Sequence, residues 1–335
     1  MDKKSRIQQI LTIILISIML VNCKPVVKKK NYEIPDELSK KIWKLQSDFC
    51  TSMMKSDYDK TLDLFNDSIA ANLLGSNYDS LFYGLKYGLF EYPYFSQDIF
   101  YQKSLFKNTK VEVLFEDEDF NPFLINFITR NKETAVTTAL LGDDDVQYSL
   151  VTLYGKYNNG WKVDYITYGL YRIDDKDALD WLVEAEKCLS TNDYIMATYC
   201  MRMVDWLLKP AQDLWCFENE PEVLGKMKRI NKKINRNLRL NKVFVNIDSK
   251  PELKDYCPVF TNKKVYPLIT YQTKLSINDS ISIEKECLEL DSQFRDICDK
   301  MIQDSIYIRI LPYTDAWVEP DTFLIKKRKL VPKVK

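Results

Sequence analysis

The strongest constraint on the fold is a run of alternating apolar and polar residues that begins at Lys110 and ends at Arg172. Alternation with a period of two is typical of a strand with one buried face. It predicts four strands, at residues 110–116, 134–141, 146–157 and 161–172. The turn between the last two contains Asn159-Gly160, which favours a tight hairpin. The pattern therefore predicts an antiparallel meander in which each strand pairs with its neighbour in the chain.

Two amphipathic helices are predicted ahead of these strands. Apolar residues recur there every three or four positions, which places them on one helical face. The two stripes are Leu38, Ile42, Leu45, Phe49 and Met53, and then Tyr58, Leu62, Phe65, Ile69 and Leu73. Ser56, with Asp59 three residues later, has the spacing of a capping box for the second helix. Residues 76–109 are rich in Tyr and Phe without a clean period, so we expect packed loops and short helices there.

This order of elements, ending in YNNGWKVDYITYG, resembles the NTF2-like cone fold over residues 32–173. In that family a curved sheet wraps around the helices, and the mouth of the cone holds a small ligand, an active site or a partner. The residues that could line such a pocket here are Tyr148, Tyr154, Trp161 and Tyr165. The alternative is that they fill the cone as core, which is the commoner role of aromatic residues at strand spacing.

Residues 174–242 are predicted to be helical and to connect two domains. Two apolar stripes, separated by residues 190–193, predict a helical hairpin closed by Pro210. The stripes are Ala178, Trp181, Leu182, Ala185 and Leu189, and then Tyr194, Ala197, Met201, Val204 and Leu208. The hairpin resembles a single TPR unit, with Ala185 and Ala197 at the small positions where its helices cross. An array needs at least three copies, so we expect a packing module.

A basic amphipathic helix follows over residues 222–242. Eight basic residues occur there from Lys226 onward without an acidic one. Such a helix can rest on an anionic membrane surface or an acidic partner, with Lys232, Lys233 and Arg236 as the candidate contacts. The simpler alternative is an ordinary solvated helix face.

The last region is predicted to be a small α+β domain over residues 243–325. Strand-like runs VFVNI, VYPLITYQTKLSI and IYIRIL flank a helix. The helix stripe is Ile283, Cys287, Leu290, Phe294, Ile297 and Met301. Residues 326–335 are strongly basic, and we expect a solvated tail.

The N-terminus has the features of an export signal over residues 1–22. A charged start is followed by an apolar core from Ile10 to Val21, which is too short for a membrane span of about 20 residues. Leu20-Val21-Asn22-Cys23 resembles the lipobox of bacterial lipoproteins, in which the cysteine is lipidated before cleavage. The resemblance implies acyl chains, palmitate among them, on Cys23 and a stable membrane anchor. The alternative is an uncleaved N-terminal anchor that contains a cysteine by chance. Residues 23–31 would then form a tether, and Lys24, in place of the Asp of inner-membrane lipoproteins, favours the outer membrane.

Several chemistries are excluded by composition. The chain has no histidine, which removes Ser-His-Asp and Cys-His catalysis and histidine-ligated metals. Neither a CxxC pair nor a glycine-rich phosphate loop occurs, so no cofactor or metal is predicted. The acidic runs at residues 116–119 and 143–145 lack EF-hand spacing and are interpreted as solvated turns. Catalysis by a pair of carboxylates survives these exclusions.

The sequence thus predicts an α+β lipoprotein of the bacterial envelope. Its expected partners are membrane lipid through Cys23 and another envelope protein, and not nucleic acid. We expect a non-catalytic binding or assembly component. The alternatives are an enzyme that uses carboxylates or a tyrosine in the cone, and a purely structural lipoprotein on the membrane surface.

Overall fold

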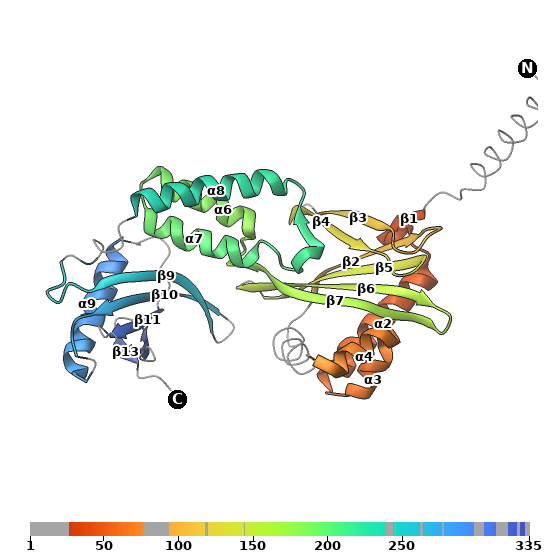
Figure 1. The fold of residues 1–335 in the computed structure, drawn as a ribbon, viewed down its shortest axis with the longest axis horizontal. Coiled ribbons are helices and arrows are strands. Elements are labelled where there is room, and N and C mark those ends of the chain that lie inside the picture. Colours follow the sequence, from red (N-terminus) through yellow and green to blue (C-terminus); the bar gives the residue numbers. More distant parts are fainter. Residues whose placement is uncertain are drawn as a thin grey trace, which may run out of the picture. The chain divides into compact units, whose positions relative to one another are not determined.

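A computed structural model describes most of the chain and shows a mixed α+β protein (Figure 1). The described residues are 27–76, 94–117, 120–143, 145–238, 244, 246–261, 264–276, 278–297, 305–312, 321–326 and 329–331. The predicted signal and Cys23 lie outside them. The chain divides into two compact units. Unit 1 holds residues up to Asp143, together with Tyr148–Gly169 and Ala211–Cys216, and unit 2 holds the remainder.

Unit 1 is built on a five-stranded sheet with the order β1-β2-β5-β6-β7. Its strands are β1 (Val27–Lys30), β2 (Tyr94–Lys103), β5 (Glu133–Gly142), β6 (Val146–Tyr157) and β7 (Gly160–Ile173). The last three are neighbours in chain order, as expected for the end of the meander. The first predicted strand is not part of it. It forms β3 (Lys110–Asp117) in a separate sheet with β4 (Phe120–Ile128) and β8 (Trp215–Phe217).

Two segments of this sheet were expected to be irregular. Val27–Lys30, predicted as part of a tether, pairs with β2 in antiparallel register from Val27↔Lys103 to Lys30↔Phe100. Residues 94–103, predicted as loops and short helices, form β2 itself and pair with β5. Both strands pair with segments that are distant in sequence. The local pattern of apolar residues therefore could not predict these pairings.

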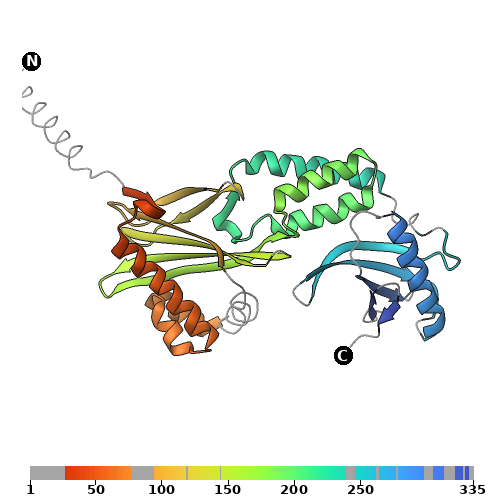
Figure 2. The same cartoon turned by 180° about the vertical axis from the view of Figure 1, so that it is seen from behind.

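Helix α2 (Asp36–Met54) crosses one face of this sheet, as the two opposite views show (Figures 1 and 2). Its stripe is confirmed, since Ile42, Phe49 and Met53 are buried. The expected second helix is broken into α3 (Tyr58–Leu64) and α4 (Asp67–Ser76). The break occurs because Phe65 turns extended and bridges to Val163, while its ring meets Phe49 at 5.7 Å.

The caps of the two short helices also differ from expectation. Asp57, and not Ser56, is the N-cap of α3 and accepts a hydrogen bond from the Lys60 amide. Asn66 plays the same part at the start of α4, where its side-chain oxygen accepts from the Ile69 amide at 3.0 Å. Each cap satisfies a backbone donor that a helix start leaves without a partner.

Unit 2 contains the predicted helical hairpin, formed by α6 (Ala178–Ser190) and α7 (Tyr194–Leu207). All five residues of the α6 stripe are buried, and Ala185 and Ala197 are both fully buried. Helix α8 (Glu220–Asn237) follows and buries Val223, Met227, Ile230 and Ile234. The prediction of a connector is wrong in one respect. The hairpin shares a core with the last sheet, since Tyr199 stacks on Tyr256 at 5.1 Å within the same unit.

The last sheet has the order β13-β12-β11-β10-β9. Its strands are β9 (Glu252–Thr261), β10 (Lys264–Thr273), β11 (Ser305–Pro312), β12 (Asp321–Lys326) and β13 (Lys329–Val331). Strands β10 and β11 are parallel, and α9 (Ser280–Ile297) lies between them in the chain. The helix packs on the sheet through Phe294, which meets Tyr256 at 4.6 Å.

Two predictions for this region are wrong. Phe244, Asn246 and Ile247, expected in a strand, lie in turns. The expected solvated tail instead contributes to the sheet, since Lys326 ends β12 and Lys329–Val331 form β13. Within the described residues, no helix combines the length and apolarity needed to cross a membrane.

Candidate functional site

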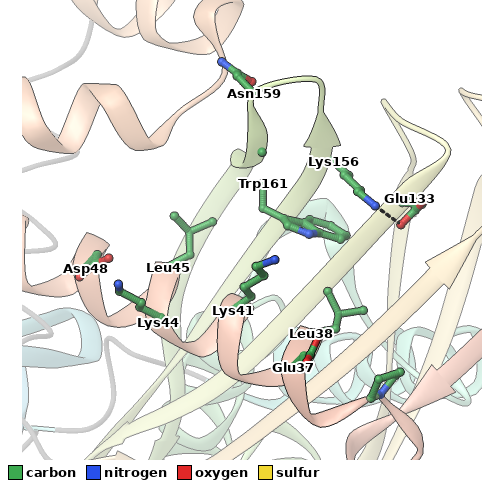
Figure 3. A pocket seen from close by; sticks show the side chains of 12 residues that line it. Glu37, Leu38, Lys41, Lys44, Leu45, Asp48, Glu133, Lys156, Asn159 and Trp161 are labelled. Atoms are coloured by element: carbon green, nitrogen blue, oxygen red, sulfur yellow. Dashed lines mark hydrogen bonds and ion pairs between the residues drawn. The ribbon is translucent and has the colours of Figure 1, made fainter.

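The candidate site is a groove of about 600 Å³ in unit 1, between helix α2 and the ends of β5, β6 and β7. Figure 3 shows apolar and charged side chains together on the α2 side of the groove, and Trp161 with the Lys156–Glu133 ion pair on the strand side. Its lining residues are Pro35, Glu37, Leu38, Lys41, Lys44, Leu45, Asp48, Glu133, Lys156, Asn159, Gly160 and Trp161.

The helical side of the groove follows from the width of the α2 stripe. Ile42 and Phe49 at the centre of the stripe are buried in the core. Leu38 and Leu45 lie at its edge and are only half-buried, so they remain as an apolar floor. Lys41 and Lys44 are exposed beside them. Neither lysine forms an ion pair with a residue in the described ranges given above.

The opposite side is dominated by Trp161 near the start of β7. Gly160 has φ 119°, a left-handed value that favours glycine and closes the tight β6–β7 turn. The strand therefore begins at once, and the Trp161 side chain projects into the groove toward α2 (Figure 3). Its ring meets Tyr101 edge-on, with centroids 6.3 Å apart. Tyr101 therefore packs against the Trp161 ring, while Trp161 remains half-buried and lines the groove.

Glu133 forms the polar end of the groove. Its carboxylate lies 3.1 Å from the Nζ atoms of both Lys103 and Lys156, and it accepts a hydrogen bond from the Tyr101 hydroxyl at 3.1 Å. Partial burial acts to raise the pKa of Glu133, but the hydrogen bonds from Lys103, Lys156 and Tyr101 outweigh it and hold the pKa below its usual value. Burial, together with the neighbouring Glu133 charge, raises the pKa of Tyr101 to about 12. Glu133 is thus a fixed carboxylate and Tyr101 a fixed donor.

The groove as a whole is close to neutral. Three lysines (Lys41, Lys44, Lys156) face three carboxylates (Glu37, Asp48, Glu133). Among the residues the structure describes, no cluster of three or more Cys, Asp or Glu side chains could hold a metal ion. The arrangement suits a ligand with an apolar body and charged or polar groups of both signs.

The four aromatic residues predicted to line a pocket have different positions. Trp161 lines the groove. Tyr154 is fully buried and its hydroxyl donates to the Gln46 side chain, so it belongs to the core. Tyr148 is also buried, and the half-buried Tyr165 lies 3.5 Å from the side-chain oxygen of Gln212. Sequence reasoning missed the α2 side of the groove, because the apolar stripe of α2 predicts a buried face and gives no signal for which of its edge residues stay uncovered.

A second polar cluster in unit 1 consists of Asp164, Asn66 and Tyr157, none of which lines the groove. Asp164 is 3% exposed and accepts hydrogen bonds from Asn66 at 2.7 Å and Tyr157 at 2.6 Å. Burial raises the pKa of Asp164, and its hydrogen bonds offset only part of that effect. The cluster ties the break between α3 and α4 to strands β6 and β7, which is a structural role.

The predicted membrane contacts lie on α8 in unit 2. Lys232, Lys233 and Arg236 are all exposed. Lys233 Nζ donates to the Leu189 carbonyl at 3.2 Å, so it also closes the end of α6. Cys23, the predicted lipid attachment site, lies outside the described residues.

Comparison with known protein families, with curated proteins and with solved structures gives no match for this chain.

Proposed function

We propose that this protein is an exported lipoprotein, anchored by acyl chains on Cys23, that binds a partner in the groove between α2 and β7. The anchor rests on the order of charged start, short apolar core and Leu20-Val21-Asn22-Cys23. The binding role rests on one observation above all, the partly open Trp161 ring set against the apolar edge of α2. The NTF2-like resemblance, in which a cone mouth holds a ligand or partner, points to the same place.

The shape of the groove favours an extended polypeptide segment as the occupant. Its α2 side runs from Pro35 to Asp48, about 20 Å at 1.5 Å per residue. An extended chain at about 3.3 Å per residue would fill that length with about six residues. Leu38 and Leu45 would contact apolar side chains, and the lysines and carboxylates beside them would pair with charged ones. A groove of mixed sign therefore suits a segment of another envelope protein.

A carboxylate- or tyrosine-based enzyme is the second candidate, because three carboxylates line the groove. Two observations weaken it. Glu37 and Asp48 are eleven residues apart in one helix, about 16 Å along its axis, whereas paired catalytic carboxylates of glycosidases lie within about 10 Å of each other. Glu133 is held ionised, so it is a poor proton donor, and Tyr101 is held protonated, so it is a poor base. Binding without chemistry accounts better for these states.

The anchor is tested by metabolic labelling with radioactive palmitate. We expect label in the full-length chain and none in Cys23→Ala, with the wild-type protein recovered in the envelope fraction. Label that persists in Cys23→Ala would show that the lipid attachment site has been assigned wrongly.

The groove is tested by photo-crosslinking in intact cells. Leu45 is replaced by the photoreactive residue p-benzoylphenylalanine, and Met54 on the same helix is the matched control. Met54 is 47% exposed but does not line the groove. We expect a discrete crosslinked species from position 45 and none from position 54, with the yield reduced by Trp161→Ala. Equal products from both positions, or none from position 45, would contradict the proposal.

A further inference from the structure

We propose that one end of unit 1 rests on an anionic membrane surface, with Phe106 dipping into the headgroup region. This inference rests on the lipid anchor proposed above. The surface, called here the basic end, consists of β1, the loop at residues 104–109 and the loop at residues 129–132, together with Lys103, Lys110 and Ile128, which flank the loops.

Three segments distant in sequence are joined at the basic end. Val27 pairs with Lys103 at the last residue of β2, so β1 starts where the 104–109 loop begins. The Ser104 amide donates to the Lys132 carbonyl at 2.8 Å, and the Asn108 amide donates to the Thr129 carbonyl at 2.7 Å. These bonds connect the two loops to each other, and the pairing of Val27 with Lys103 places the start of β1 beside them.

Phe106 is presented at the basic end by a fixed loop. Its carbonyl accepts hydrogen bonds from the Ser104 hydroxyl at 2.7 Å and the Thr109 hydroxyl at 3.1 Å. Its side chain is nevertheless 73% exposed, and Ile128, which pairs with Lys110 at the start of β3, is 63% exposed. Phe106 and Ile128 thus give the basic end two exposed apolar side chains on or beside loops that hydrogen bonds hold together, which suits contact with a membrane interface.

The charge of the basic end matches an anionic lipid surface. The sequences of its three segments, VKKK, KSLFKNTK and ITRNK, contain no acidic residue. Its exposed basic side chains are Lys28, Lys103, Lys107, Lys110, Arg130 and Lys132. Glu133, which follows the second loop, is already paired with Lys103 and Lys156. Basic residues around an exposed aromatic are typical of proteins that lie on a membrane interface.

The short distance between the proposed lipid anchor at Cys23 and the start of β1 favours a membrane as the partner of the basic end. Only three residues separate Cys23 from Val27, and a fully extended chain spans at most about 3.6 Å per residue. The start of β1 therefore lies within about 14 Å of a lipidated Cys23. At this distance from the headgroups, lipid is the nearest available binding partner for the basic end.

The test uses the full-length chain attached to vesicles through its own N-terminal segment, with amide hydrogen exchange as the readout. Vesicles contain phosphatidylcholine alone or mixed with phosphatidylglycerol. We expect exchange at Leu105, Phe106 and Lys107 to slow in the mixed vesicles relative to phosphatidylcholine alone. The triple variant Lys28→Glu, Lys107→Glu and Lys132→Glu should lose this protection, since each basic residue favours contact about fivefold. None of these three lysines forms an ion pair with another residue of the described part of the chain.

The control carries the same charge change on α8, as Lys228→Glu, Arg229→Glu and Lys232→Glu, and should keep the protection of the loop. The inference is overturned if the loop exchanges equally in both vesicles, or if the α8 variant loses the protection instead. A chain that does not attach to vesicles at all contradicts the anchor of the proposed function, which separates that failure from a wrong choice of surface.

Discussion

Glu133 shows how a single carboxylate organises one end of the groove. Replacing it by Gln removes two ion pairs and weakens the hydrogen bond from Tyr101. Because its pKa is lower in the folded chain than the ordinary 4.5, its contribution is present above that value and is lost as the pH falls through the folded pKa. We expect Glu133→Gln to lower the free energy of unfolding by about 1–2 kcal/mol at pH 7.

Urea denaturation at pH 7 and below pH 4 measures this effect, and the difference between wild type and variant should shrink at the lower pH. Glu37→Gln is the matched control, since Glu37 lines the same groove but is exposed. A loss that is the same at both pH values would mean that the carboxylate charge is not what stabilises the site.

Gly155 faces the buried polar cluster around Asp164. A Cβ atom built at this position would overlap the Asp164 carboxylate and the Asn131 amide far inside contact distance. We expect Gly155→Ala to destabilise the fold by about 1–3 kcal/mol, because the cluster cannot move without breaking its hydrogen bonds. The control is Gly225→Ala in α8, where the nearest neighbouring atom is the end of the Arg229 side chain at 3.7 Å. There the higher helix propensity of alanine should stabilise by about 0.5–1 kcal/mol, as chemical denaturation will show.

Cys188 and Cys257 are both half-buried, yet they should differ in reactivity. A hydrogen bond with the Cys200 thiol lowers the pKa of Cys188, whereas burial raises the pKa of Cys257. Since the thiolate is the nucleophile, we expect iodoacetamide at pH 7.5 to modify Cys188 first. Peptide mass spectrometry after short exposure measures the order. Cys200→Ser should slow the reaction of Cys188 by removing its thiol partner, and an unchanged order and rate in that variant would contradict the explanation.

Trp161 is the one predicted pocket residue that lines the groove. Its position after Asn159-Gly160 identified it, because turn chemistry is local. Leu38, Lys41 and Leu45 were missed as site residues because they come from a helix more than 100 positions away. A stripe of apolar residues predicts a buried face but not which edge residues the partner element leaves uncovered. Tyr154 failed as a pocket residue for the same reason, since Gln46 of α2 covers it.

At the scale of elements, the N-caps of α6 and α8 test whether a capping side chain fixes the start of a helix. Asp177 accepts hydrogen bonds from the Leu179 amide at 2.8 Å and the Asp180 amide at 3.1 Å. Asn219 occupies the same position before α8 but makes no capping hydrogen bond with its side chain. We expect Asp177→Ala to cost about 1–2 kcal/mol and Asn219→Ala less than about 0.5 kcal/mol, measured by thermal or urea unfolding. Equal costs would show that something other than capping fixes these helix starts.

The elements that were predicted correctly all have a pattern that is complete within a short stretch of sequence. Helices α2, α6, α7, α8 and α9 each have a stripe that is complete within 12 to 20 residues, and β5 to β7 alternate and are joined by short turns. The missed strands have weak local patterns and distant partners. Strand β4 contains Pro122, β9 contains Pro258, and β12 and β13 overlap the basic segment that suggested a tail. Their place in a sheet depends on pairing that no local window contains.

At the scale of the whole molecule, the division into units was only partly predictable. The change of period predicted a boundary after residue 173, whereas unit 1 includes β7 only as far as Gly169 and also takes in Ala211–Cys216. The helical hairpin was separated from the last domain because nothing in its stripes distinguishes a core shared with a sheet from a core of its own. Tyr199 and Tyr256, which stack in unit 2, are 57 positions apart in the sequence. Composition predicts that such aromatic residues are buried but not which of them meet.

The missing histidines should give the whole chain an unusually flat stability profile near neutral pH. Histidine is the side chain whose ordinary pKa lies between 6 and 8, and this chain has none. Stability changes with pH only where the folded and unfolded states bind different numbers of protons. We therefore expect the free energy of unfolding to change by less than about 1 kcal/mol between pH 6 and pH 8, as measured by urea denaturation.

At acidic pH the free energy of unfolding should fall steeply with falling pH. Two opposing effects act there, and the destabilising one is larger. Asp164, whose pKa burial raises, favours the folded state at low pH and loses that contribution as the pH rises through its folded pKa. Carboxylates such as Glu133 act in the opposite sense, and their protonation also leaves 48 basic residues without matching negative charge. Burial also raises the pKa values of Asp174, Asp193 and Asp205, which act in the same sense as Asp164. Repulsion among the basic charges outweighs these aspartates, so unfolding should become easier below about pH 4. A decline of several kcal/mol already between pH 8 and pH 6 would show that a buried group with a strongly shifted pKa controls the stability of the whole molecule.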